Sequence, residues 1–541
     1  MKKIIKTSVL LSTAVILGSG LTIVAHAATD KTINWTESAD LSTLDPSTVQ
    51  ELVSDDAITA SGDGLYRNDA SGKPQLSLAQ SVDKSADGLT YTFKLRNGIK
   101  WANGDPITAQ DFVYGWQRTV NPKTKSVYAY LYSGIKNADA INKGQDKNLN
   151  DLGVKALDDQ TLQVTLEKPL PQLTAELTMP EFFPQNQKFE EKVGKKYATT
   201  STDAISAGPF IVKGWNGSSN SYELVKNPNY WDAKSVKTPK ITVQTVKDQN
   251  TGYNLYKQGK VDFTTLSSDQ VRASQKRSDY KVIPTAATRY LELNERRVPA
   301  FKNAKVRQAI SYAINRDQLA NHVLRGTATP ATTFTATRLA KVPGTTEDFA
   351  KDAQVKGAIA YNEAKAKSLC KAGLQETGTS KLNLQVLTDD SDASKNTAEF
   401  LQSQLQKLPG LKISVKEVPA KQRIALTTGS RKFDIAISNW MADYADPSTF
   451  LDLYTSDSSF NDGGWSSATF DAAEKAAKTT DVNDDSKRFA DYKTAEQTIE
   501  KDTGVVPLYY ASSATLFRTS VKGVVANTTG AQYDWKWAYK H

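Results

Sequence analysis

A carboxylate at the end of a predicted strand is the group best placed to do chemistry in this 541-residue chain. Residues 433–447 begin as an apolar strand around Ile435, pass Trp440, and reach Asp443 just before Pro447 signals a turn. A strand end is a rigid place to hold a charge, and a carboxylate held there can bind a cation. The stretch by itself leaves the identity of that cation open.

Residue types that usually build catalytic and metal sites are scarce. Of the three histidines, His26 lies in a predicted leader, His541 ends the chain, and His322 falls in a predicted helix with no His or Cys at ligand spacing. Cys370 is the single cysteine, which excludes an intramolecular disulfide. Residues 481–492 begin like a calcium loop but lack its glycine and its closing glutamate. We therefore expect no cofactor and no metal, while a hydrolase built on an Asp/Glu pair stays open.

The start of the chain has the pattern of a secretory signal peptide. Three lysines precede an apolar run over residues 9–24, and Ala25-His26-Ala27 forms an A-x-A cleavage site. We predict cleavage before Ala28; an uncleaved membrane anchor is the alternative, although polar residues interrupt the run. Removing those lysines lowers the formal net charge from +9 to +6. The remaining positive charges are dispersed, which argues against a nucleic-acid partner and leaves either simple solubility or adhesion to anionic cell-wall polymers.

Length and periodicity predict several α/β lobes. A chain of 541 residues exceeds one ordinary core, and 39% of its residues are hydrophobic. Up to about residue 185 the pattern is α+β, with alternating strands at 89–96 and 162–166 and a capped helix that starts after Thr108. The C-terminal half alternates strand and helix, which favours a mostly parallel sheet with a ligand at the carboxyl ends of its strands. Asp443 falls at such an end.

Tryptophan and tyrosine recur beside predicted turns, with single charges among them. Aromatic walls with a few oriented polar groups are typical of ligand cavities. The same rings serve equally well as core residues, so this pattern alone does not decide between the two.

A run of segments resembles the oligopeptide-binding proteins, which are the solute-binding subunits of peptide ABC importers (extracellular solute-binding family 5). The matching segments appear in the family's order over essentially the whole mature chain: 78–81, 88–96, 100–118, 151–156, 227–232 (NPNYWD), 306–309, 315–317, 439–444 (NWMADY) and 506–510. The resemblance implies an α/β fold of the periplasmic-binding-protein type II class, with two hinged main lobes and an extra α+β lobe.

The resemblance also implies roles for particular residues. Asp443 would pair with the α-ammonium group of a bound peptide, and Leu52 would lie near the start of that peptide. Strand-like contacts to the peptide backbone would come from Trp440, Met441 and Ala442 and from the segment Ala287 to Tyr290. Further cavity residues would be Tyr114, Asn254 and Tyr510.

Three features depart from patterns found in members of the family. Some members pair cysteines where this chain has Ala287 and Met441, so that disulfide is absent. Arginines that receive a peptide carboxylate in some members are replaced by Thr428 and Ile437. Candidate substitutes are Arg289, Arg325, Arg431 and Lys432. Gram-positive members are commonly lipoproteins, whereas here no cysteine stands directly after the predicted leader.

These observations give a definite expectation. We expect an exported, monomeric binding protein that captures extended oligopeptides and delivers them to a membrane permease with a separate ATPase. The expected boundaries are 1–27 for the signal peptide, 28–62 with 187–286 and 513–541 for lobe I, 63–186 for the extra lobe, and 287–512 for lobe II, with hinges near Thr285 and Ser512. A pheromone or adhesion receptor with the same fold is the alternative, and a secreted carboxylate-pair hydrolase is a third.

Overall fold

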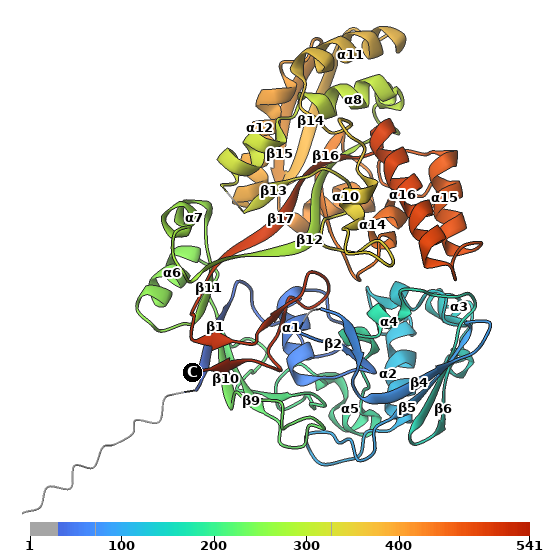
Figure 1. Ribbon diagram of the computed structural model, residues 1–541, viewed down its shortest axis with the longest axis vertical. Helices are drawn as coiled ribbons and strands as arrows, with labels where there is room; N and C mark the ends of the chain where they lie inside the picture. The colour runs from blue at the N-terminus through green and yellow to red at the C-terminus, as the bar shows by residue number, and fades with distance from the viewer. Residues whose placement is uncertain (1–30, 71, 326) are drawn as a thin grey trace, which may run out of the picture. The chain divides into compact units, whose positions relative to one another are not determined.

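The computed structural model describes residues 31–70, 72–325 and 327–541. The predicted signal peptide and its cleavage site lie outside these residues. Three sheets and the helices around them organise the described chain (Figure 1). None of the described helices is both long and apolar enough to cross a membrane.

The largest sheet, here called the large sheet, contains the strand that ends just before Asp443. Its strand order is β11-β17-β12-β16-β14-β15, and β13 pairs with β17. The strands are β11 (Phe263–Thr265), β12 (Tyr280–Leu293), β13 (Ala328–Pro330), β14 (Leu382–Asp389), β15 (Leu411–Val418), β16 (Ile435–Met441) and β17 (Val506–Phe517). Apolar residues of β14, β15 and β16 are buried because helices pack over them.

The expectation of a mostly parallel sheet is wrong. Only β14 pairs in parallel, with β15 and with β16, whereas β11, β12, β13, β16 and β17 form antiparallel pairs. The reason is that the two long central strands, β12 and β17, run in opposite directions beside each other. Antiparallel pairing of this kind needs no crossover helix. The expected strand end at Asp443 is confirmed, because β16 stops two residues before it.

Helices surround the strands of the large sheet. Helices α8, α11 and α12 accompany β14 and β15 (Figure 1), and their apolar residues share one core with these strands. The helices are α8 (Ala304–Ala313), α9 (Arg316–Gln318), α10 (Phe349–Ala353), α11 (Glu363–Glu376), α12 (Asp392–Leu405), α13 (Ala420–Ile424), α14 (Ser448–Leu451), α15 (Ala468–Lys478) and α16 (Asp485–Asp502). Helices α14, α15 and α16 contribute to a second cluster that includes Trp465.

A four-stranded antiparallel sheet of order β4-β5-β7-β6, here called the β4–β7 sheet, forms the predicted α+β region. The predicted capping box is confirmed: the Thr108 backbone N–H donates to Asp111 Oδ2 at 2.7 Å, and helix α2 begins there. The elements are β2 (Tyr66–Asn68), β3 (Pro74–Leu76), β4 (Ala79–Lys84), β5 (Thr90–Leu95), α2 (Ala109–Val120), the 3-10 turn η1 (Ala129–Tyr132), α3 (Ala138–Asn142), β6 (Val154–Asp158), β7 (Thr161–Thr165), α4 (Leu173–Glu176), η3 (Pro180–Phe182) and α5 (Gln187–Val193).

A second four-stranded sheet, of order β1-β10-β9-β8, shares one core with residues from the C-terminal end of the chain. Trp35 of β1 is fully buried and stacks on Phe263 with ring centroids 3.8 Å apart, while Trp535 from the C-terminus meets it edge-on. The elements are β1 (Ile33–Glu37), α1 (Leu52–Ser61), β8 (Phe210–Lys213), β9 (Ser221–Lys226), β10 (Lys240–Thr245), α6 (Gln249–Lys257), α7 (Ser268–Ser274), β18 (Val521–Lys522), β19 (Val525–Ala526), β20 (Tyr533–Asp534) and β21 (Tyr539–Lys540).

Candidate functional site

Asp443 sits in a turn that its neighbours hold in place. The Asp443 backbone N–H donates to Thr449 Oγ1 at 3.2 Å, and the Trp440 indole Nε1 donates to the same oxygen at 3.3 Å. Thr449 belongs to helix α14, so the turn is tied to the helix that follows it. The side chain of Asp443 is half-buried and is therefore a pre-positioned acceptor.

Tyr130 supplies the polar contact to the Asp443 side chain. Its hydroxyl donates to Asp443 Oδ2 at 2.8 Å from the 3-10 turn η1. Burial raises the pKa of Asp443 to about 6, and the hydrogen bond from Tyr130 offsets part of that rise. Asp443 is therefore largely ionised at pH 7 and gains from a positive partner.

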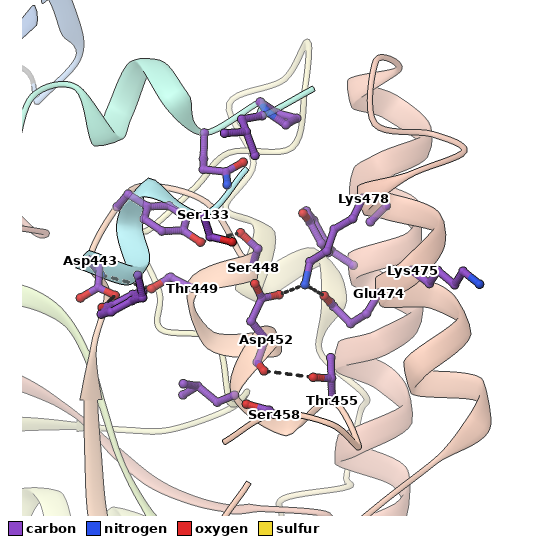
Figure 2. A pocket seen from close by; sticks show the side chains of 18 of the residues that line it. Ser133, Asp443, Ser448, Thr449, Asp452, Thr455, Ser458, Glu474, Lys475 and Lys478 are labelled. Carbon is purple, nitrogen blue, oxygen red and sulfur yellow. Dashed lines mark hydrogen bonds and ion pairs between the residues drawn. The ribbon is translucent and has the colours of Figure 1, made fainter. Parts of the chain in front are cut away.

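A cavity of about 810 Å³ opens beside Asp443. Figure 2 shows Asp443, Thr449 and Ser133 at one part of its wall and Asp452, Glu474 and Lys478 at another. Aromatic rings line the wall next to the carboxylate: Phe460 meets Trp440 and Tyr130 edge-on, with ring centroids 5.3 and 6.4 Å apart. A carboxylate among aromatic faces suits an ammonium group, which both can attract.

Three further carboxylates surround Asp443 without a cation. Glu176, Glu181 and Asp55 are 4%, 1% and 8% exposed, and each has one oxygen with no hydrogen-bond partner. Burial and repulsion by Asp443 raise the pKa of Glu176 and of Glu181 to about 8, and burial holds the pKa of Asp55 well above its usual range. None of these four carboxylates takes part in an ion pair within the described chain. The site therefore combines one largely ionised carboxylate, Asp443, with three buried carboxyl groups that a nearby cation would help to ionise.

The predicted residues of the Trp440 motif lie together. Trp440 and Asp443 line the cavity, and Ala442 is buried with its backbone N–H donating to the Ala286 carbonyl oxygen at 2.8 Å. Met441 pairs with Ala287 in the register of β16 and β12. The two positions that carry paired cysteines in some relatives are thus direct neighbours here, held by strand pairing alone.

Strand β16 has a free edge next to the cavity. On the side away from β12, β14 pairs with it only at Ile435 and Ala436. From Ile437 to Met441 that edge has no strand partner within the described chain. An extended peptide can add to such an edge through its backbone.

The other predicted residues lie elsewhere. Tyr290 is buried against Phe334, with ring centroids 5.1 Å apart, and the buried Tyr510 hydroxyl accepts from the Thr333 backbone N–H at 2.9 Å. Leu52 begins α1, and Asn254 is exposed on α6. Tyr114 donates to Glu190 Oε2 at 2.7 Å, and none of the cavities beside Asp443 is lined by these five residues.

The suggested substitutes for a carboxylate receptor are largely engaged by acids. Arg289 lies 3.9 Å from Asp389, and Arg431 Nε lies 3.7 Å from Asp462. Arg325 pairs with Asp269, whereas Lys432 is exposed.

Sequence reasoning missed Tyr130, Phe460 and Glu176. Tyr130 lies 313 positions from Asp443, and no local pattern connects residues so far apart. The nearest signal is the pair Tyr128 and Tyr130, whose ring centroids are 6.1 Å apart: Tyr128 packs against the core of this region, whereas Tyr130 is 38% exposed.

Comparisons with known proteins agree on one family. The profile described as "Bacterial extracellular solute-binding proteins, family 5 Middle" matches residues 73–462. A dipeptide-binding protein of Lactococcus lactis subsp. cremoris is 40% identical over 547 residues, covering 98% of each chain. OppA of Listeria monocytogenes bound to peptide superposes with a TM-score of 0.80 at 35% identity, over 95% of this chain and 99% of that one. The pheromone receptor PrgZ gives a TM-score of 0.80 at 32% identity, over 95% and 100%.

Proposed function

The chain belongs to family 5 of the bacterial extracellular solute-binding proteins and has their binding-protein fold, and on that premise we propose that it captures oligopeptides in extended form. It then delivers them to the membrane permease of an ABC importer, which a separate ATPase powers. The similarity to a dipeptide-binding protein and to a peptide-bound OppA supports this substrate class.

One observation carries the proposal: the half-buried Asp443 carboxylate lines a cavity and has no cationic side chain paired with it within the described chain. A peptide's α-ammonium group supplies the missing charge, and the low-dielectric surroundings strengthen that pairing. A fixed anchor for the amino end sets the register of a peptide without reading its side chains.

The free edge of β16 supports binding of an extended backbone. Residues Ile437 to Met441 lead directly to Asp443, so a strand added there has its end near the carboxylate. Backbone hydrogen bonds give affinity that depends little on sequence.

Two long strands supply a route for closure. The pairing of β12 with β17 is interrupted between Pro284 and Thr288, next to the proposed hinges at Thr285 and Ser512. We take 28–62, 187–286 and 513–541 as lobe I, 63–186 as the extra lobe, and 287–512 as lobe II. A peptide touching both main lobes shifts the population toward the closed form.

Export completes the proposal. Residues 1–27 act as the signal peptide, and the mature chain works outside the cytoplasmic membrane as a monomer. The family's description as extracellular supports this location.

A peptide-pheromone receptor is the second candidate, which the likeness to PrgZ favours. A peptide permease encoded beside the gene argues for import, and its absence argues for signalling. A secreted hydrolase predicts cleavage, so unchanged masses of a peptide library after incubation remove it.

The test is isothermal titration of free-amine and N-acetylated peptides against the wild type, Asp443→Asn and the control Asp457→Asn. Asp457 is an exposed carboxylate on the same cavity wall. We expect Asp443→Asn to weaken free-amine peptides by a factor of about 30 or more, since truncating a desolvated charge pair costs about 2 kcal/mol or more. Equal binding by wild type and Asp443→Asn would overturn the anchor.

A further inference from the structure

Glu176 lines the same cavity as Asp443 and is the best-buried acid on that wall after Glu474. It ends helix α4, is 4% exposed, and its Oε2 has no hydrogen-bond partner. Buried polar atoms normally have partners, and an orphaned one loses its hydration without compensation. A residue that lines a ligand cavity and holds a buried, unpartnered acceptor is a candidate to be completed by a ligand group.

The charges around Glu176 are negative. Asp443, Asp446 and Asp452 all raise its pKa, after burial, and a hydrogen bond with Gln172 lowers it. Of these acids, Asp446 is paired with Arg488 at 2.6 Å and Asp452 is paired with Lys478, whereas Asp443 forms no ion pair within the described chain. The electrostatic potential at Glu176 therefore favours a second positive charge on a ligand whose α-ammonium group pairs with Asp443.

The lysines of the cavity do not provide that charge. Lys478 is held by Asp452 and Glu474, as Figure 2 shows, with its Nζ 3.2 Å from Glu474. Lys168 and Lys475 are exposed and form no ion pair with Glu176 within the described chain. Glu474, the other buried acid of this wall, thus has a cationic partner, whereas Glu176 has none within the described chain.

We propose, building on the proposed function, that Glu176 binds the side chain of a lysine or arginine at the first position of the peptide, so that the site prefers peptides with a basic amino-terminal residue. The α-ammonium at Asp443 fixes residue 1 beside the cavity, and its flexible four-carbon or guanidinium side chain reaches into the cavity. A first residue with a basic side chain provides one positive charge for Asp443 and one for Glu176, whereas a first residue with a neutral side chain pairs with Asp443 alone. The aliphatic part of that side chain packs against the rings of Tyr130 and Phe460.

Proton release provides a signature that a merely structural acid lacks. With a pKa of about 8, Glu176 is mostly protonated at pH 7 in the free protein. The groups that face it are Asp443, Asp452 and the paired Asp446, together with the buried Tyr444 hydroxyl. Binding a cationic side chain ionises Glu176, so a Lys-first peptide releases close to one proton more than a Leu-first peptide, about 0.9 at pH 7.

The experiment is isothermal titration of two tetrapeptides that differ only at residue 1, Lys or Leu, against wild type, Glu176→Gln and Glu181→Gln. Glu181 is a matched control because it is equally buried and also acts electrostatically on Asp443. We expect wild type and Glu181→Gln to bind the Lys-first peptide about tenfold more tightly, as one charge-assisted contact supplies. Glu176→Gln should reduce that ratio to about one while still binding the Leu-first peptide.

Each outcome decides a separate point. Equal affinity of both peptides for the wild type, or a preference that survives Glu176→Gln, overturns the role of Glu176. If Glu181→Gln also loses the preference for the Lys-first peptide, that preference comes from the combined charge of the buried acids. This outcome, too, overturns the specific role of Glu176. Failure of both peptides to bind the wild type overturns the proposed function itself. Titration of the wild type in two buffers of different ionisation enthalpy measures the proton release without any variant, and equal release by both peptides contradicts the inference.

Discussion

The hydroxyl of Tyr130 donates a 2.8 Å hydrogen bond to Oδ2 of Asp443, although the two residues are 313 positions apart. The bond leaves Oδ1 for a ligand. It also stabilises the ionised form of a carboxylate that burial would otherwise favour in its neutral form. Tyr130 thus acts on the ligand through the charge state of Asp443.

Tyr130→Phe should weaken the binding of free-amine peptides, most strongly at low pH. A hydrogen bond to a charged group contributes roughly 1.5–3 kcal/mol, so its loss moves the acid limb of the affinity profile up by about one to two pH units. Titration calorimetry at pH 6 and 7.5 measures the shift. Tyr128→Phe is the control, because the Tyr128 hydroxyl forms no hydrogen bond to Asp443. Tighter binding by Tyr130→Phe would mean that Tyr130 competes with the ligand.

Affinity for a neutral free-amine peptide should be bell-shaped in pH. Below pH 6 Asp443 gains a proton, since its pKa is about 6, and binding should fall about tenfold between pH 7.5 and pH 5. Above about pH 8 the peptide's own α-ammonium loses its proton. N-acetylated peptides should lack the alkaline limb, and Asp443→Asn should lack the acid limb. A flat profile between pH 5 and 7.5 would contradict the anchor.

Local patterns predicted most elements of the fold. Alternation at 89–96 corresponds to β5, the capping box at Thr108 starts α2, and the apolar run before Asp443 is β16. Each of these patterns acts within one or two turns of chain, where neighbouring residues decide the conformation.

Properties that depend on distant pairing could not be predicted in the same way. The direction of β12 and β17 depends on how the strands re-enter the sheet, and a strand's own sequence carries little of that information. The family resemblance suggested Tyr290 and Tyr510 as ligand contacts, and in the structure the rings of both are buried in the core beside β12 and β17. Tyr130 and Glu176 reach the site only because the region of the β4–β7 sheet lies against the turn after β16.

Stability should increase as pH falls from 8 toward 5.5. Burial raises the pKa of Glu37, Glu181 and Glu292 to about 8 in the folded chain. In the unfolded chain glutamates titrate near pH 4.3, so as pH rises the unfolded chain loses these protons at a lower pH than the folded chain does. The stabilising contribution is complete below the unfolded pKa and disappears as pH rises through the folded one.

Glu292→Gln isolates one of these groups. It should raise the midpoint of thermal unfolding at pH 8 by about 1–3 °C and flatten its dependence on pH, because the amide cannot ionise. Scanning calorimetry at pH 5.5 and 8 measures both effects, and Asp457→Asn, an exposed position, should change neither. A midpoint that rises with pH in the wild type would show that other groups dominate.

The carboxyl end of the peptide should contribute little to affinity. Thr428 and Ile437 stand where some relatives have arginines, and Thr428 Oγ1 donates instead to Asp462 Oδ2 at 2.9 Å. Arg289 and Arg431 lie beside acids of their own, so a peptide carboxylate would compete with those acids. We expect amidation of a tetrapeptide's C-terminus to change its affinity less than twofold, and N-acetylation to reduce it by a factor of about 30 or more. A tenfold loss on amidation, measured by titration calorimetry, would reveal a carboxylate receptor, and Arg289→Gln with Arg431→Gln would then determine which arginine provides it.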